Sequence, residues 1–219
     1  MEKANGWWFP DKESHLPKWL EEVKKKKQSV ILNNREAYQG KKQVAAMAAC
    51  KQFRNAIDVG GHVGLWSFNL SHKFKHVDAF EPMQAHRDCF AKNVLATRSN
   101  VTLHACALGS CEGSVSMITE TTSSGDTRVG GEGDIPMKTL DSFNLNDVDL
   151  IKIDCEGYEL FVIKGGVETI RRCRPTIIVE QKPGHGEAYG LSDTEAVSFL
   201  KDMGYKLVKE MAGDYILTC

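Results

Sequence analysis

Short apolar runs alternate with helix-like stretches along most of this chain. The apolar runs have the length and the β-branched content of strands, and in most intervening stretches apolar residues recur at three- and four-residue spacing. This alternation predicts βαβ units built on a parallel sheet. The predicted strands span 55–60, 76–82, 101–108, 148–157 and 174–182. The predicted helices span 65–74, 84–97, 158–173 and 191–204.

The last strand-like segments differ from the others in their connection. Segments 205–210 and 214–219 are separated by only a short turn. We therefore expect an antiparallel hairpin at one edge of an otherwise parallel sheet. We also expect the helix at 158–173 to be interrupted at Gly165 and Gly166.

A glycine-containing loop interrupts the alternation in the middle of the chain. Strand-like segments 113–120 and 135–143 flank residues 121–134, which contain four glycines among small polar residues. Such a segment is either a lid over a site or a slack connection.

The N-terminal part has a different pattern. Segments 18–28 and 35–52 show helical spacing. We expect residues 1–54 to form a helical cap on a main domain at 55–219, the whole being one structural domain.

Composition narrows the class of protein. The 219 residues carry a formal net charge of −1, so no global field favours nucleic acid or an anionic membrane. No window approaches the roughly 18 apolar residues of a membrane span, and the N-terminus lacks a secretory apolar region. The seven cysteines are odd in number and form no CxxC pair, which favours reduced thiols and a cytoplasmic protein.

The turn after the first main-domain strand is the first candidate site. The segment "NAIDVGGHVGLWSFNL" places Asp58, Gly60, Gly61 and Gly64 where the backbone of an α/β sheet approaches a ligand. Val59 stands where the dinucleotide fingerprint requires glycine, and no Gly-Lys-Ser/Thr follows. The turn therefore does not predict a pyrophosphate site. Its glycines alone are also compatible with a tight turn and nothing more.

A carboxylate at the end of the next strand changes this interpretation. Glu81 lies in "DAFEP", at the end of the second main-domain strand. A carboxylate there can accept hydrogen bonds from both hydroxyls of a ribose. A site that binds ribose without pyrophosphate suits S-adenosyl-L-methionine (SAM), which contains adenosine and no phosphate.

Acidic residues end four of the predicted strands. If the strands are parallel, Asp58, Glu81, Asp154 and Glu180 emerge at one edge of the sheet, with His185 in the loop after Glu180. Carboxylates gathered in this way are costly unless they bind a positive or hydrogen-bonding group. This convergence is the strongest functional signal in the chain.

The motifs resemble those of a known family. "IDVGGHVGLWS", "DAFEP", "HACALG", "MKTLDSF", "LIKIDCEGYELFVIKGG" and "RPTIIVEQ" follow the order and spacing of the FkbM family of SAM-dependent methyltransferases over residues 55–181. The most specific match is "KIDCEGYE", close to the family's K-I-D-x-E-G-x-E. The chain resembles small stand-alone members, including phage-borne ones. The resemblance implies an α/β, Rossmann-like class I methyltransferase fold with a mostly parallel seven-stranded sheet, and methyl transfer to a hydroxyl.

The resemblance also implies a set of cofactor-binding residues. The methionine part of SAM would lie at the glycine turn, the ribose at Glu81, and the adenine near Met83 and the segment after the third strand. Asp154 would face the methionine ammonium or the acceptor. His62 stands where the family commonly has asparagine. The predicted cofactor-binding residues are Asp58, Gly60, Gly61, His62, Gly64, Glu81, Met83, Cys106, Ala107 and Asp154.

An alcohol needs a base as it attacks, so a proton acceptor is expected near the acceptor site. His185 is the first candidate because imidazole titrates near neutral pH. Glu180 and Asp154 are alternatives. We predict a site without a metal ion, with the open alternative that these two carboxylates hold a divalent cation and a diol acceptor.

Three functions compete. The first is O-methylation of a hydroxyl on a sugar, glycan or secondary metabolite, with no nucleic-acid or membrane partner. The second is methylation of nucleic acid, against which stand the near-neutral charge and the lack of an Asn/Asp-Pro-Pro-Tyr/Phe signature. The third is a non-catalytic scaffold that binds the cofactor without turnover.

Overall fold

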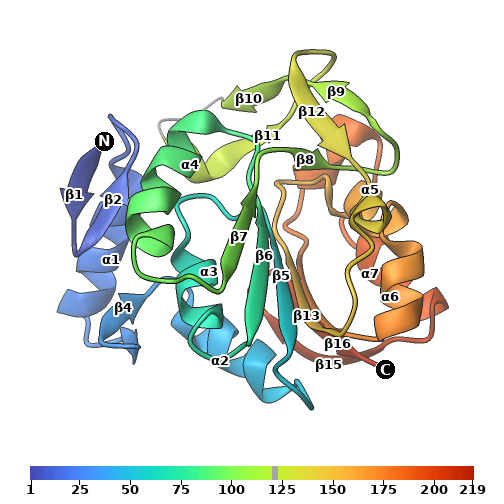
Figure 1. Cartoon of the computed structure of the whole chain (residues 1–219), viewed down its shortest axis with the longest axis horizontal. Coiled ribbons are helices and arrows are strands. Elements are labelled where there is room, and N and C mark those ends of the chain that lie inside the picture. Colours follow the sequence, from blue (N-terminus) through green and yellow to red (C-terminus); the bar gives the residue numbers. More distant parts are fainter. Residues whose placement is uncertain (120–122) are drawn as a thin grey trace.

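A seven-stranded sheet forms the centre of the protein in the computed structural model, which describes residues 1–119 and 123–219 (Figure 1). The strand order is β15-β16-β14-β13-β5-β6-β7. Strands β14, β13, β5, β6 and β7 pair in parallel, whereas β16 pairs antiparallel with both β14 and β15. The predicted sheet with its antiparallel edge hairpin is confirmed. The strands are β5 (Asn55–Val59), β6 (His76–Phe80), β7 (Val101–His104), β13 (Val148–Ile153), β14 (Thr176–Glu180), β15 (Lys206–Met211) and β16 (Asp214–Thr218).

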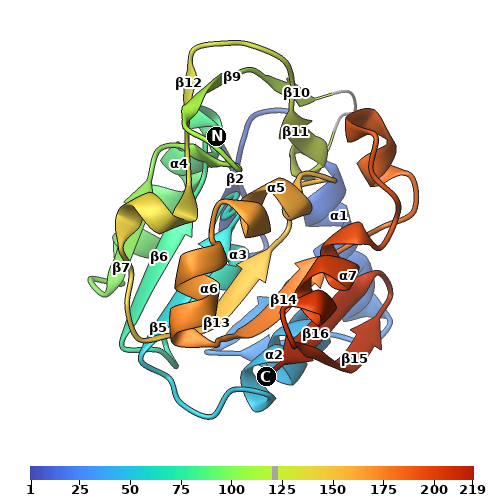
Figure 2. The same cartoon turned by 90° about the vertical axis from the view of Figure 1, so that its right-hand side faces the viewer.

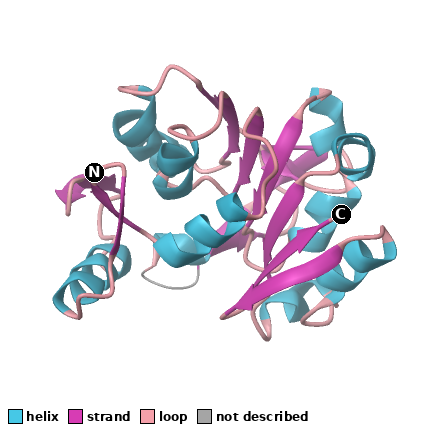
Figure 3. Cartoon of the chain, turned by 90° about the horizontal axis from the view of Figure 1, so that it is seen from below, coloured by secondary structure: helices cyan, strands magenta, loops and turns pink. Residues whose placement is uncertain are grey.

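Helices cover both faces of the sheet (Figures 2 and 3). Successive strand residues point to opposite faces, and the central strands are apolar at both positions. Leu150 belongs to the core under α3 and α4, whereas Ile151 belongs to the core under α5, α6 and α7. These helices are α3 (Leu65–Leu70), α4 (Gln84–Phe90), which continues as a π-helix (Ala91–Leu95), α5 (Glu159–Lys164), α6 (Val167–Cys173) and α7 (Glu195–Asp202).

The predicted interruption of the helix at 158–173 is confirmed. Helix α5 ends at Lys164, and α6 begins at Val167. A Cβ on Gly165 would lie 1.9 Å from the carbonyl oxygen of Gly109, so only glycine lets the helix break approach that backbone.

The N-terminal part is less helical than the sequence predicted. The predicted helix 35–52 is wrong at its start, because Arg35–Ala37 is a strand that pairs with Val30–Leu32. Asn33 and Asn34 form the turn between them with φ of 51° and 63°, a conformation that asparagine tolerates and that suits a two-residue hairpin. The elements are the hairpins β1 (Glu2–Ala4) with β2 (Trp7–Phe9) and β3 (Val30–Leu32) with β4 (Arg35–Ala37), and the helices α1 (His15–Lys25) and α2 (Gly40–Ala48).

This N-terminal part packs directly on the main sheet's helices. The Trp7 side chain is fully buried, and its ring contacts Phe68 of α3 at a centroid distance of 5.3 Å. The division of the chain at residue 54 stays a prediction.

Smaller strands and short helices extend beyond the carboxyl ends of the main strands. The loop predicted at 121–134 contains the short helix η2 and a strand. Glu120, Thr121 and Thr122 lie outside the described residues. The elements are β8 (Ala107–Leu108), β9 (Gly113–Val115), β10 (Met117–Thr119), η2 (Ser124–Asp126), β11 (Thr127–Val129), β12 (Ile135–Lys138), η3 (Leu140–Phe143) and η4 (His185–Tyr189). None of the helices in the described part of the chain has the length and apolar character needed to cross a bilayer.

Candidate active site

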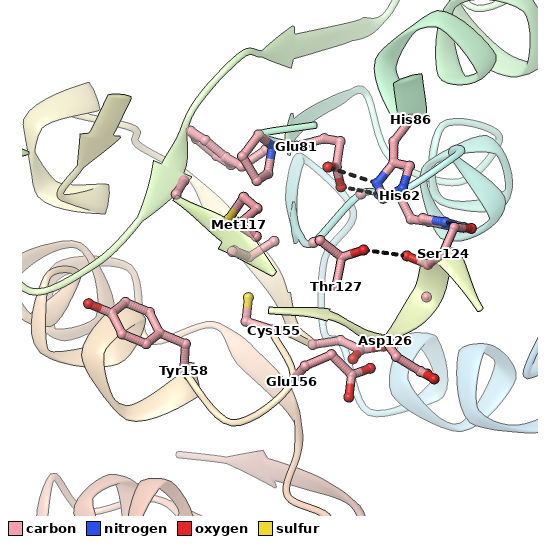
Figure 4. Close-up of a pocket in the computed structure, with 18 of the residues that line it drawn as sticks. His62, Glu81, His86, Met117, Ser124, Asp126, Thr127, Cys155, Glu156 and Tyr158 are labelled. Carbon is pink, nitrogen blue, oxygen red and sulfur yellow. Dashed lines mark hydrogen bonds and ion pairs between the residues drawn. The ribbon is translucent and has the colours of Figure 1, made fainter. Parts of the chain in front are cut away.

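A pocket lies beyond the carboxyl ends of the central parallel strands, where ligands bind in open α/β sheets (Figure 4). Its walls come from the turn after β5, from Glu81 after β6, from the turn after β13 and from Lys182 after β14. Residues 123–127 and three residues of the N-terminal part, His15, Leu16 and Tyr38, also line the pocket. Strand ends distant in sequence therefore converge on one site.

The glycine turn after β5 is shaped by close backbone packing. Gly60 has φ of +74°, and a Cβ there would lie 2.0 Å from the carbonyl oxygen of Asp154. Gly64 has φ of +91°, and a Cβ there would lie 2.4 Å from Val94 Cγ2. Gly60 and Gly61 line the pocket. Gly64 instead begins α3 and lets it approach the π-helix.

Asp58 lies beneath the pocket, outside its lining. Its side chain is fully buried and accepts a hydrogen bond of 2.6 Å from Ser67 Oγ. Lys152 Nζ lies 3.1 Å from Asp58 Oδ1 and donates to the carbonyl oxygens of Val59 and Gly60 at 3.1 and 2.7 Å. Asp58 therefore orients a lysine that holds the glycine turn.

Lys152 is a site residue that the sequence analysis missed. Burial disfavours its charged form, but the carboxylates of Asp58 and Asp154 outweigh that effect and raise the pKa of Lys152 above its usual range. The available signal was a lysine in the middle of an otherwise apolar strand, since such a charge is rarely buried without a partner.

The Glu81 carboxylate is held in one orientation. The backbone N–H of His62 donates to it at 2.8 Å, and His86 Nδ1 lies 3.1 Å away (Figure 4). The backbone N–H of Met83 also donates to it at 2.8 Å. Glu81 is 4% exposed and lines the pocket. Met83, predicted near adenine, is outside the lining, and its backbone supports Glu81 instead.

His62 links the glycine turn to the loop above it. Its Nε2 lies 2.8 Å from Ser124 Oγ, and its ring contacts His86 at 4.4 Å. Burial holds the pKa of His62 well below its usual value, and the neighbouring His86 adds to this effect. His62 is therefore neutral at physiological pH. Its φ of 48° is the left-handed conformation, which asparagine adopts more readily than most residues.

The apolar wall of the pocket follows β7. Cys106 and Ala107 line the pocket, as the sequence predicted, and are 5% and 4% exposed. Burial raises the pKa of the Cys106 thiol, so it stays protonated and acts as an apolar group.

The three predicted catalytic side chains lie near one another, around the ends of β13 and β14. Glu180 is 2% exposed, and His185 Nδ1 lies 2.9 Å from Glu156 Oε2. Asp154 and Glu156 line the pocket, whereas Glu180 and His185 are outside its lining. Glu156 was not predicted, although it belongs to the quoted motif "KIDCEGYE".

Crowding of these carboxylates changes their proton affinity. Burial raises the pKa of Glu156 to about 8 and that of Glu180 to about 9, and the charge of Asp154 adds to both shifts. Burial lowers the pKa of His185, and the neighbouring Lys182 lowers it further. Burial opposes ionisation of Asp154 as well, but Lys152 and Lys182 keep its pKa below the usual value.

The loop over the pocket is tied to the N-terminal part. Glu13 accepts hydrogen bonds from the backbone N–H groups of His15 and Leu16 at 2.6 and 3.0 Å, and from that of Ser124. Tyr189 Oη donates to the carbonyl oxygen of Val129 at 2.7 Å. The described loop residues are thus held on two sides where they line the pocket.

The sheet order and the pocket beyond its strand ends define a Rossmann-like methyltransferase fold. Residues 58–207, more than half of the chain, match the family model described as the methyltransferase FkbM domain. The protein belongs to the FkbM family of methyltransferases. No match was found among curated proteins.

Solved structures show the same fold. The methyltransferase FkbM of Methylobacillus flagellatus KT has a TM-score of 0.50 and 19% identity over 75% of this chain and 43% of that protein, so the chain spans less than half of its length. A Streptococcus mutans methyltransferase, solved with S-adenosylhomocysteine (SAH), has a TM-score of 0.51 and 12% identity over 81% of this chain and 94% of that one. An rRNA methylase of Clostridium thermocellum has a TM-score of 0.52 and 11% identity over 83% and 94%.

Proposed function

We propose that the protein is a SAM-dependent O-methyltransferase that acts on a hydroxyl of a sugar, glycan or secondary metabolite. The observation that carries the proposal is a single pocket with two different ends. One end presents the fixed carboxylate of Glu81, and the other presents Asp154 and Glu156.

The first end suits the adenosine part of SAM. Glu81 is a hydrogen-bond acceptor whose orientation is set by two backbone N–H groups, so it can accept from ribose hydroxyls without reorganisation. Cys106 and Ala107 offer an apolar surface for adenine. The backbone of Gly60 and Gly61, which line the pocket, would lie against the methionine part. The residues present fit the cofactor.

The second end suits the chemistry of an alcohol. When bound, SAM supplies an electrophilic methyl group, whose carbon bonds to the acceptor oxygen as its bond to sulfur breaks and the electron pair stays on sulfur. The chain's residues must align the acceptor and take its proton. Asp154, Glu180 and His185 are the candidates for the proton acceptor, and only Asp154 among them lines the pocket.

The test of the reaction is methyl transfer from isotopically labelled SAM to a panel of diols, sugars and phenols, analysed by mass spectrometry. We expect a product heavier by one labelled methyl group that keeps its amines unmodified. Labelled RNA or DNA in place of such a product would establish the alternative of nucleic-acid methylation. Binding of SAM without transfer to any acceptor would favour the scaffold.

The proposal places the reaction in the cytoplasm. All seven cysteines belong to the described part of the chain, and none of them forms a disulfide there. Reduced thiols are typical of that compartment.

A further inference from the structure

A cluster of ligand-type side chains adjoins the second end of the pocket, which one of its members, Glu156, lines. Glu156, Glu180 and His185 each offer one ligand atom, and these three atoms lie within 4.8 Å of one another. We propose that this cluster binds a divalent metal ion, and that the ion holds the hydroxyl groups of the acceptor. The acceptor part rests on the proposed function, whereas binding of the ion does not.

The most direct observation concerns Glu180. Its side chain is 2% exposed, and Lys182 Nζ forms an ion pair with Oε2 at 2.8 Å. Oε1 is buried, receives no hydrogen bond from an N–H group of the described part of the chain, and the carboxyl group of Asp154 lies beside this side chain. A buried carboxylate oxygen in that state is costly, and a metal ion at the cluster supplies the missing partner.

The charged side chains around the cluster also favour a bound cation. Lys152 lies within ion-pair distance of Asp58 and Asp154, and Lys182 of Glu180. Glu156 has only the imidazole of His185 as an ion-pair partner among the described residues. The carboxylates of Asp154, Glu156 and Glu180 therefore repel one another, and a divalent cation bound by Glu156 and Glu180 relieves that repulsion.

The backbone fixes the ligands against one another. Glu156 has φ of 52° and Gly157 has φ of +101°, so the turn after β13 is held in the left-handed conformation. A Cβ on Gly157 would lie 2.1 Å from the carbonyl oxygen of His185. The glycine therefore lets the turn that carries Glu156 touch the loop that carries His185. Backbone packing therefore fixes the positions of Glu156 and His185 relative to each other.

The donor set defines the class of ion and acceptor. Two carboxylates and one imidazole suit Mn²⁺ or Zn²⁺ better than Ca²⁺, because imidazole is a poor ligand for Ca²⁺. Three protein ligands leave coordination positions open, and Glu156 lines the pocket. An acceptor with two adjacent oxygens, such as a vicinal diol, can fill two such positions. With Glu180 and His185 engaged, Asp154 remains as the proton acceptor.

The experiment uses Mn²⁺ as the probe on the full-length protein after treatment with a chelator. Free Mn²⁺ is counted by electron paramagnetic resonance, and heat is measured by calorimetry. We expect one saturable equivalent. Glu180→Gln keeps the side-chain volume and should weaken Mn²⁺ binding about a hundredfold. Glu187→Gln removes an exposed carboxylate from η4, the short helix that begins at His185, and should leave the affinity unchanged.

His185→Ala is the second variant, because His185 is half-buried and its loss is tolerated more easily than a change at Glu180. Absence of saturable Mn²⁺ binding to the wild type, or equal affinity in the wild type and in the folded variants, overturns the metal site. SAH binding is measured in parallel without metal. SAH binding without Mn²⁺ binding leaves the proposed function intact, whereas Mn²⁺ binding without SAH binding contradicts only the proposed function.

Discussion

Lys152 Nζ lies 3.1 Å from Asp58 Oδ1, and the two side chains are 5% and 0% exposed. The pair joins β13 to β5 directly beneath the glycine turn, and the same ammonium group donates to the carbonyl oxygens of Val59 and Gly60. The floor of the pocket is therefore held by a buried ion pair rather than by apolar packing alone.

Removal of one side chain of this ion pair should destabilise the protein, because the other charge stays buried. We expect Lys152→Met to lower the free energy of unfolding by about 3–5 kcal/mol, because Asp58 is left as an uncompensated buried charge. Urea unfolding at pH 7 measures this change. The double variant Asp58→Asn, Lys152→Met should be more stable than Lys152→Met alone. A double variant that is no more stable than the single one would show that the ion pair has no such role.

The glycine turn offers a matched pair of substitutions. Gly60→Ala places a Cβ against the carbonyl oxygen of Asp154 at a positive φ, so we expect a loss of more than about 1 kcal/mol of stability and at least about a tenfold weaker binding of SAH. A Cβ on Gly131 would have no neighbouring atom within 4 Å, so Gly131→Ala should change neither the stability nor the binding of SAH. Thermal melts and calorimetry measure both. Equal behaviour of the two variants would contradict the packing account of the turn.

Glu159 makes stability depend on pH. Its Oε1 accepts hydrogen bonds from the backbone N–H groups of Cys155 and Gly157. Burial nevertheless raises the pKa of Glu159 to about 7. Between about pH 4.5 and pH 7, the folded protein therefore keeps a proton on Glu159, whereas the unfolded chain has lost it. The stability from this group is complete below pH 4.5 and is lost as the pH rises through 7.

Glu159→Gln retains the acceptor oxygen and cannot ionise. We expect the stability of the wild type relative to this variant to fall by up to about 3 kcal/mol between pH 4.5 and pH 8. The measurement is urea unfolding at several pH values. Glu168→Gln, at an exposed position on α6, should show no such trend. A constant difference between wild type and Glu159→Gln across this range would rule out the raised pKa.

The loop over the pocket should respond to Glu13. Glu13→Ala removes the acceptor for the N–H group of Ser124, so we expect faster hydrogen exchange at Ser124 and about tenfold weaker SAH binding. Glu21→Ala, on the exposed side of α1, is the control. Unchanged exchange at Ser124 would mean that the N-terminal part does not restrain the loop.

Local patterns were sufficient for the main sheet and for the first end of the pocket. The apolar runs of β5, β6, β13 and β14 are continuous because these strands are buried on both faces, and an acid after such a run marks the strand end. Glu81 and Gly60 were therefore predictable from their place in the chain. The hairpin at Asn33 and Asn34 was not, because its strands are too short to show an alternating pattern.

The roles of other residues depend on contacts that sequence spacing does not reveal. Asp58 ends its strand like the other acids, yet it faces Lys152 and Ser67 beneath the pocket. Glu156 gains its neighbours only because Gly157 lets the His185 loop approach the turn. Such cross-strand and loop-to-loop distances arise from tertiary packing, so the sequence could indicate the edge of the sheet but not the partners there.

If Glu81 holds the ribose of the cofactor, calorimetric titration with SAH will show it. The wild type and the control Glu112→Ala, which changes an exposed acid between β8 and β9 that is outside the pocket lining, should each bind one equivalent of SAH. Glu81→Ala should show no measurable binding while remaining folded by circular dichroism. Equally tight binding by Glu81→Ala, or no binding by the wild type, would contradict the account.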